Sequence, residues 1–185
     1  MTRDNELSSR TFETSGSGDF DAPPARRTVV LGLGNPIMGD DGLGLVALER
    51  LRALEFAPPV TLVDGGTWGL ALLGDVEAAD SLLLLDALEI GAAPGSLHIV
   101  AGDDIPRVFS TKLSPHQVDV RELLALATLR GTLPRRMILV GIQVAEVDLG
   151  LELSPAVASQ VDAMVDAAVA VLASWGHYAT ERPVH

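Results

Sequence analysis

The chain has 185 residues, of which 48% are hydrophobic and only 4% aromatic. This length suits a single globular domain with a core of aliphatic side chains. Its formal net charge of −12 argues against a nucleic-acid partner, which would require a basic surface. The chain contains no cysteine, which excludes disulfides and thiolate metal ligands. No apolar run approaches the length of a membrane span, so we expect a cytoplasmic protein without a membrane partner.

The two ends of the chain differ in composition from its middle. Residues 1–27 are rich in Ser, Thr, Asp, Gly and Pro and show no hydrophobic period, which predicts a disordered extension. Arg26-Arg27 precede an apolar run, but glycines interrupt it too early for a twin-arginine export signal. We therefore expect one α/β domain over residues 28–176 and a flexible tail over residues 177–185.

The first half of the domain alternates between strand and helix patterns. Thr28 to Leu33 is a β-branched, apolar run that glycine ends, which predicts a buried strand. Apolar residues then recur at helical spacing from Leu43 to Leu54. A second strand is expected over residues 60–63 and a helix over residues 68–79. The continuous apolar run from Ser81 to Leu85 is typical of a central strand covered on both faces, and we expect it to end at Asp86.

The second half continues the alternation. A short strand is expected over residues 96–100 and an apolar one over residues 137–144. Ser114-Pro115 and Ser154-Pro155 each combine an N-cap serine with a proline at the first helical position, which predicts two helix starts. Strands that alternate with helices indicate a three-layer α/β/α sandwich with a mostly parallel sheet of about five strands.

The turn after the first strand is rich in glycine but carries two carboxylates. Such strand-to-helix turns commonly bind phosphate, but Asp40 and Asp41 would repel it and attract a cation. The dinucleotide pattern G-x-G-x-x-G also fails, because Ile37 occupies its third glycine position. Asp41, Asp64 and Asp86 each follow an expected strand. We expect them to converge at the carboxyl edge of the sheet, where α/β proteins bind ligands.

Four motifs in order resemble the maturation endopeptidases of nickel-iron hydrogenases. They are GNPIMGDDGLG, DGGTWGLALLGD, LLLLDA and SPHQ, and they cover nearly the whole ordered chain. The resemblance implies cleavage of a C-terminal peptide from the hydrogenase large-subunit precursor after nickel insertion. It also implies that Asp41, Asp86 and His116 recognise the substrate's nickel and are the candidate catalytic residues. Nickel would arrive with the substrate, and no organic cofactor is implied.

The chemistry of these three residues fits the implied role. Nickel(II) accepts both imidazole and carboxylate ligands, and two nearby carboxylates would repel each other without a cation. A carboxylate acting as general base could activate water, or the metal could activate the water or polarise the peptide carbonyl. The sequence leaves both routes open, so an aspartic-type assignment is not fixed. The oligomeric state is also open.

Two other functions are weighed against this one. A non-catalytic, nickel-dependent hydrogenase assembly factor could use the same three ligands. The segment Gly32 to Pro36 also resembles the opening of bacterial peptidyl-tRNA hydrolases, but that family's Thr-Arg-His-Asn segment is missing. Two neighbouring residues are given structural interpretations: Asp40 is expected to be a helix N-cap or turn residue, and Trp68 a partly buried packing residue.

Overall fold

The computed structural model describes residues 27–110 and 115–181 and is built around a five-stranded sheet. The strand order is β3-β1-β4-β6-β5. The strands are β1 (Thr28–Leu33), β3 (Thr61–Gly66), β4 (Ser81–Leu88), β5 (Leu97–Ala101) and β6 (Arg136–Gln143). Neighbouring strands run parallel except β5, which pairs with β6 antiparallel. The expected mostly parallel sheet of about five strands is confirmed.

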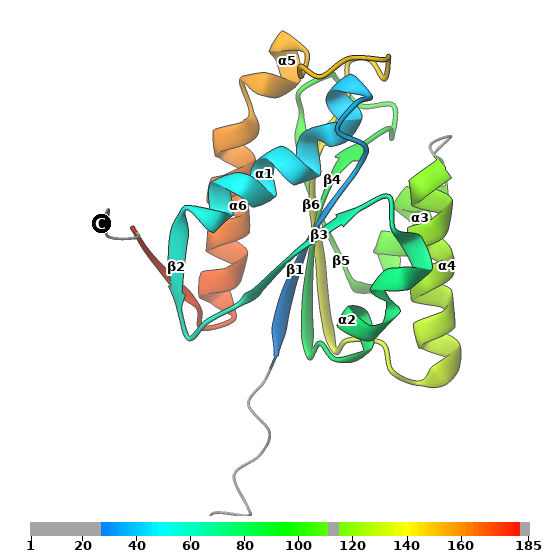
Figure 1. Ribbon diagram of the computed structural model, residues 1–185, viewed down its shortest axis with the longest axis vertical. Helices are drawn as coiled ribbons and strands as arrows, with labels where there is room; N and C mark the ends of the chain where they lie inside the picture. Colours follow the sequence, from blue (N-terminus) through cyan, green and yellow to red (C-terminus); the bar gives the residue numbers. More distant parts are fainter. Residues whose placement is uncertain (1–26, 111–114, 182–185) are drawn as a thin grey trace, which may run out of the picture.

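Helices cover both faces of this sheet (Figure 1). The helical segments are η1 (Gly39–Gly42), α1 (Leu43–Arg52), η2 (Gly69–Leu72), α2 (Leu73–Glu77), η3 (Gly102–Asp104), α3 (Ile105–Ser110), α4 (Pro115–Arg130), α5 (Pro155–Ala158) and α6 (Val161–Ser174). Helices α1 and α6 lie on one face, and α2, α3 and α4 lie on the other. The expected three layers are therefore present. None of the described helices is both long and apolar enough to cross a bilayer.

Two hydrophobic cores lie on the two sides of the sheet. Successive side chains of a strand point to opposite faces, so Leu82 and Leu84 join the core beneath α3 and α4. Leu83 and Leu85 join the core beneath α1 and α6. All four leucines are almost completely buried, and burying each one stabilises the fold by about 1.5–3 kcal/mol. This two-sided burial explains why the strand reads as an unbroken apolar run.

Strand β4 is longer than the sequence predicts. We expected it to end at Asp86, but it continues to Leu88 because β6 keeps pairing with it, Asp86 opposite Gly141 and Leu88 opposite Gln143. A carboxylate in a central strand is unfavourable on propensity alone, which is why the sequence points to an earlier end. Asp86 therefore lies within the sheet.

A second, two-stranded sheet corrects the expectation of a flexible tail for residues 177–181, whereas residues 182–185 lie outside the described residues. Strand β7 (Tyr178–Glu181) pairs antiparallel with β2 (Leu54–Ala57). His177 is 6% exposed, and its ring nitrogens lie 2.8 Å from the Pro58 carbonyl oxygen and 2.8 Å from the Thr28 hydroxyl. Neither strand has a strong apolar period, so only the pairing of distant segments reveals them. The expected disorder of residues 1–27 lies outside the described residues, except at Arg27.

Candidate active site

The carboxyl end of β1 turns sharply into η1 and α1. Gly34 makes this turn possible, since its φ is 122° and a Cβ there would lie 1.8 Å from the Asp41 carbonyl oxygen. Its N–H donates to the Gly66 carbonyl oxygen at 3.1 Å, which ties the turn to the end of β3. Only glycine fits so close to the neighbouring backbone. The turn thus brings Asp41 back over the end of its own strand.

Asp41 lies in η1 and is 3% exposed. Its Oδ2 accepts a hydrogen bond from the Asn35 N–H at 3.0 Å. The position of η1 is set by Gly44, where a Cβ would lie 2.2 Å from the Leu85 carbonyl oxygen and 2.4 Å from that of Leu33. The start of α1 therefore packs directly against the end of β1 and the middle of β4. Asp41 is held at this junction.

Asp86 is completely buried in β4, the strand next to β1. Its Oδ1 accepts a hydrogen bond from the Ala87 N–H at 2.8 Å. Segment η1 contacts β4, so Asp41 and Asp86 come from elements that touch at the carboxyl edge. Burying a carboxylate is costly unless other groups compensate for its lost hydration. Two buried carboxylates in touching elements are the main chemical feature of this edge.

His116 lies in the first turn of α4. Figure 1 shows that α4 begins at the upper end of the molecule, where β1, β4 and β6 also end. The side chain of His116 lies outside the described part of the chain. Within the described part, no group of three His, Asp or Glu side chains could hold a metal ion. The meeting of His116 with the two carboxylates therefore stays a prediction.

Asp64 is the third carboxylate expected at this edge. It lies in β3, directly opposite Gly32 of β1. Its side chain is exposed, whereas Asp41 and Asp86 are buried. Asp64 therefore shares the edge with them but lies at its surface.

Asp40 lies in the short 3-10 turn η1, as one of its two expected roles required, but it is not a helix N-cap. It is completely buried and caps no helix of its own. Its Oδ1 accepts from the Ser154 N–H at 2.7 Å, and its Oδ2 accepts from the Ser154 hydroxyl at 2.9 Å. The same Oδ2 accepts from the N–H groups of Ala145 at 2.9 Å and Glu146 at 3.3 Å. Asp40 thus joins η1 to the loop that follows β6.

Trp68 and Gln143 follow or end strands at the same edge. Trp68, expected to be a partly buried packing residue, is 70% exposed. Gln143 is buried, and its Oε1 accepts from the N–H groups of Ile90 at 2.9 Å and Ala92 at 3.2 Å. It holds the loop that leaves β4 beyond Asp86. In the sequence, the only sign of this role is that Gln143 is a polar residue near the end of an apolar strand.

The fold and this edge define an α/β protein with an acidic site at the carboxyl ends of its parallel strands. The family model of the hydrogenase maturation proteases matches residues 46–171. A hydrogenase expression/formation protein, HupD of Rhizobium leguminosarum bv. viciae, is 39% identical over 164 residues, which is 87% of this chain and 81% of the relative. The hydrogenase 2 maturation protease of Escherichia coli is 32% identical over 158 residues, covering 84% and 96%.

Solved structures give the same result. The hydrogenase maturating endopeptidase HybD from E. coli has a TM-score of 0.81 and 31% sequence identity to this chain. The match covers 84% of this chain and 98% of that one. The chain therefore belongs to the hydrogenase maturation protease family and is an endopeptidase, as its four motifs predicted.

Proposed function

We propose that this endopeptidase removes a C-terminal peptide from a nickel-loaded hydrogenase large-subunit precursor. Asp41, Asp86 and His116 would contact the nickel that the substrate carries. The observation that carries the proposal is the burial of Asp41 and Asp86 in touching elements at the carboxyl edge of the sheet. The names of the family and its relatives supply the class of substrate.

Electrostatics supports a cation at this place. Two carboxylates in a poorly hydrated environment create a strongly negative potential, and a divalent cation lowers it. Carboxylate and imidazole are both ligands that nickel(II) accepts. A chain without cysteine can still bind a nickel ion whose thiolate ligands belong to the substrate. The nickel would therefore be part of the substrate, and its contact with the protease would distinguish a precursor that has received nickel from one that has not.

Two chemical routes fit this arrangement. In the first, Asp41 or Asp86 takes a proton from water, and the resulting hydroxide attacks the scissile carbonyl carbon. In the second, the substrate's metal polarises the carbonyl oxygen or activates the water. Exchanging the precursor's nickel for zinc separates the routes. The second route predicts a single-turnover rate that changes with the metal, whereas the first predicts a similar rate for every metal that binds in the same place.

The first prediction concerns Asp41→Asn and Asp86→Asn. Each variant loses a negative charge but keeps nearly the same shape, so we expect the cleavage rate to fall at least about 100-fold because nickel contact or proton transfer is lost. Intact mass of the cognate precursor after incubation measures the peptide released. Nickel-loaded precursor should be shortened, and precursor without nickel should stay at full length.

Asp103→Asn is the matched control, since Asp103 is exposed in η3, which follows the antiparallel strand β5 and therefore lies at the amino ends of the parallel strands. It should cleave at the wild-type rate. Equal cleavage of both precursor forms would contradict nickel recognition. Cleavage at the wild-type rate by both site variants would show that neither Asp41 nor Asp86 is needed for the reaction. Precursor that binds stably but keeps its mass would contradict the endopeptidase reaction on this substrate.

A further inference from the structure

The loop 145–153, which follows β6, exposes large apolar side chains. Leu149 and Leu151 are 82% and 81% exposed, and Val147 is 37% exposed. Leucines left this open to water give up the stabilisation that burial provides. Clustered exposed apolar side chains commonly mark a surface for a partner. We call the docking platform this loop together with the groove beside it, which is lined by Pro36, Gly42, Leu45, Val46, Leu151 and Leu153.

Several hydrogen bonds hold the loop in place. Asp40 fixes its first residues and the serine that follows it. In its middle, the Gly150 N–H donates to the Ile37 carbonyl oxygen at 3.0 Å, and the Gly39 N–H donates to the Gly150 carbonyl oxygen at 2.8 Å. The loop is thus attached to the segment that leads into Asp41. A surface fixed in this way loses little conformational entropy when a partner binds.

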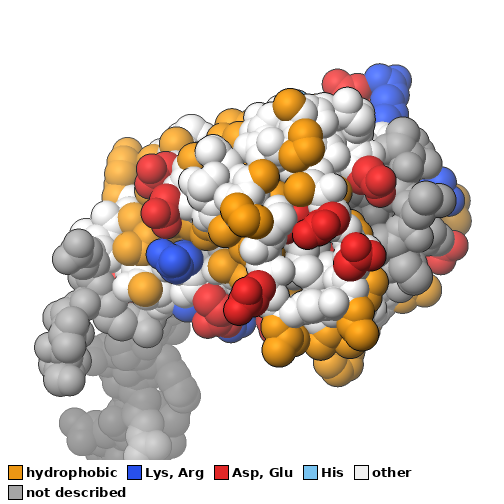
Figure 2. Space-filling model, turned by 90° about the horizontal axis from the view of Figure 1, so that it is seen from above, with side chains coloured by type: hydrophobic (Ala, Val, Ile, Leu, Met, Phe, Trp, Pro, Cys, Tyr) orange, Lys and Arg blue, Asp and Glu red, His pale blue; other side chains and the backbone are white. Residues whose placement is uncertain are grey.

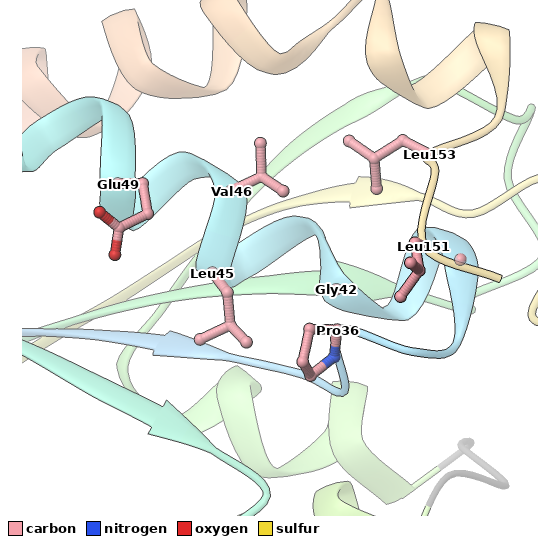
Figure 3. A pocket seen from close by; sticks show the side chains of 8 residues that line it. Pro36, Gly42, Leu45, Val46, Glu49, Leu151 and Leu153 are labelled. Atoms are coloured by element: carbon pink, nitrogen blue, oxygen red, sulfur yellow. The ribbon is translucent and has the colours of Figure 1, made fainter.

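An apolar groove runs beside the loop (Figure 3). Its walls include Pro36, Leu45 and Val46 on one side and Leu151 and Leu153 on the other, and it encloses about 170 Å³. Gly42 also lines it, directly after Asp41 in the chain. A segment lying in the groove would therefore end next to the proposed site.

The charges around the groove indicate what it binds. Glu146, Asp148 and Glu152 are exposed on the loop. The ion pairs within the described ranges involve other acidic residues, among them Glu49, which lines the groove and pairs with Arg52. No lysine or arginine occurs between Arg136 and Arg182. Figure 2, which looks onto this edge from above, shows hydrophobic side chains interspersed with acidic ones, with basic side chains toward the left and right margins of the view. A complementary partner therefore combines apolar side chains with lysine or arginine.

We infer that the docking platform binds the precursor through apolar side chains next to basic ones and guides the scissile segment to Asp41. This inference rests on the proposed function. A second copy of this chain is a less suitable occupant, because it would bring the same carboxylates and net charge of −12 to the interface. The occupant is thus a basic, apolar stretch of the precursor.

The test compares two variants with two matched controls on the nickel-loaded precursor. Leu149→Ser/Leu151→Ser removes the apolar contacts, and Leu129→Ser is its control, since Leu129 is 84% exposed on α4. Asp148→Lys reverses one platform charge, and Asp103→Lys reverses an exposed charge at the opposite edge. We expect the leucine variant to raise both KM and the precursor's Kd about tenfold, with kcat almost unchanged. Asp148→Lys should raise KM several-fold.

The outcomes separate this inference from the proposed function. Failure of the wild type to shorten the precursor contradicts the proposed function, and the Kd values then still decide whether the platform binds it. If the wild type cleaves but the leucine variant matches Leu129→Ser in KM and Kd, the docking inference is wrong. It is also wrong if sedimentation shows a wild-type dimer that the leucine variant dissociates while KM stays constant.

Discussion

Asp40 and Asp41 are neighbours in sequence, but their carboxylates serve different parts of the molecule. Asp41 accepts from the Asn35 N–H and stays over the end of β1, whereas Asp40 reaches residues 145–154. The repeated aspartate in GDDG therefore combines a candidate site residue with a residue that positions it. Because Asp40 also fixes the docking platform, it connects the proposed site to the surface proposed to receive the substrate.

Replacing Asp40 by alanine should strongly destabilise the fold. The substitution leaves three buried or half-buried N–H groups and the Ser154 hydroxyl without their acceptor. Each buried donor left without an acceptor costs about 1–3 kcal/mol, so we expect a total loss of about 3 kcal/mol or more, which chemical denaturation measures. Asp103→Ala, at an exposed position, should change the unfolding free energy by less than about 0.5 kcal/mol. Equal unfolding midpoints for the two variants would show that the Asp40 network does not stabilise the fold.

At the scale of elements, the junction of α1 with β1 and β4 is the feature that sets the site. Sequence periodicity predicts each of these elements, and all three are present. It does not predict how closely they approach. That approach depends on Gly44, where the backbone of α1 lies against the carbonyl groups of Leu33 and Leu85. The spacing between Asp41 and Asp86 depends on the same contact.

Gly44→Ala should therefore impair both stability and cleavage. A new Cβ would overlap two backbone carbonyl oxygens, and backbone cannot move aside as a flexible side chain can. We expect a loss of about 1–3 kcal/mol in unfolding free energy and a lower cleavage rate, as α1 shifts away from β4. Gly74→Ala is the matched control, since a Cβ there meets no atom within 4 Å. Wild-type stability in Gly44→Ala would show that the glycine is not needed for the packing of α1 against β4.

At the scale of the whole molecule, charge is unevenly placed along the chain. The stretch between Arg136 and Arg182 contains no lysine or arginine and includes the platform loop at the carboxyl edge. A surface with one sign of charge attracts an oppositely charged partner over several ångströms and raises its association rate. The same attraction weakens in salt, because the Debye length falls from about 10 Å at 0.1 M to about 3 Å at 1 M.

Association of the precursor should accordingly depend on ionic strength. We expect its association rate constant to fall about tenfold as salt rises from about 0.05 M to about 0.5 M, as stopped-flow fluorescence can measure. Asp148→Lys should give a shallower dependence, and Asp103→Lys should follow the wild type. An association rate constant that does not change with salt would show that electrostatic attraction does not contribute to substrate binding.

The α/β class, the main strands and the family can be predicted from the amino-acid sequence, because they depend on local period, turn chemistry and short motifs. The sequence also placed Asp41 and Asp86 at strand ends, although β4 continues past Asp86. Three features become visible only in the folded chain: Asp40 is buried and accepts a hydrogen bond from Ser154, Trp68 is exposed, and β2 pairs with β7. The Asp40 contact and the pairing of β2 with β7 each join segments that lie far apart in the chain. A local pattern reports what a segment favours alone, whereas the partner of a buried carboxylate or an edge strand is chosen only when the chain packs.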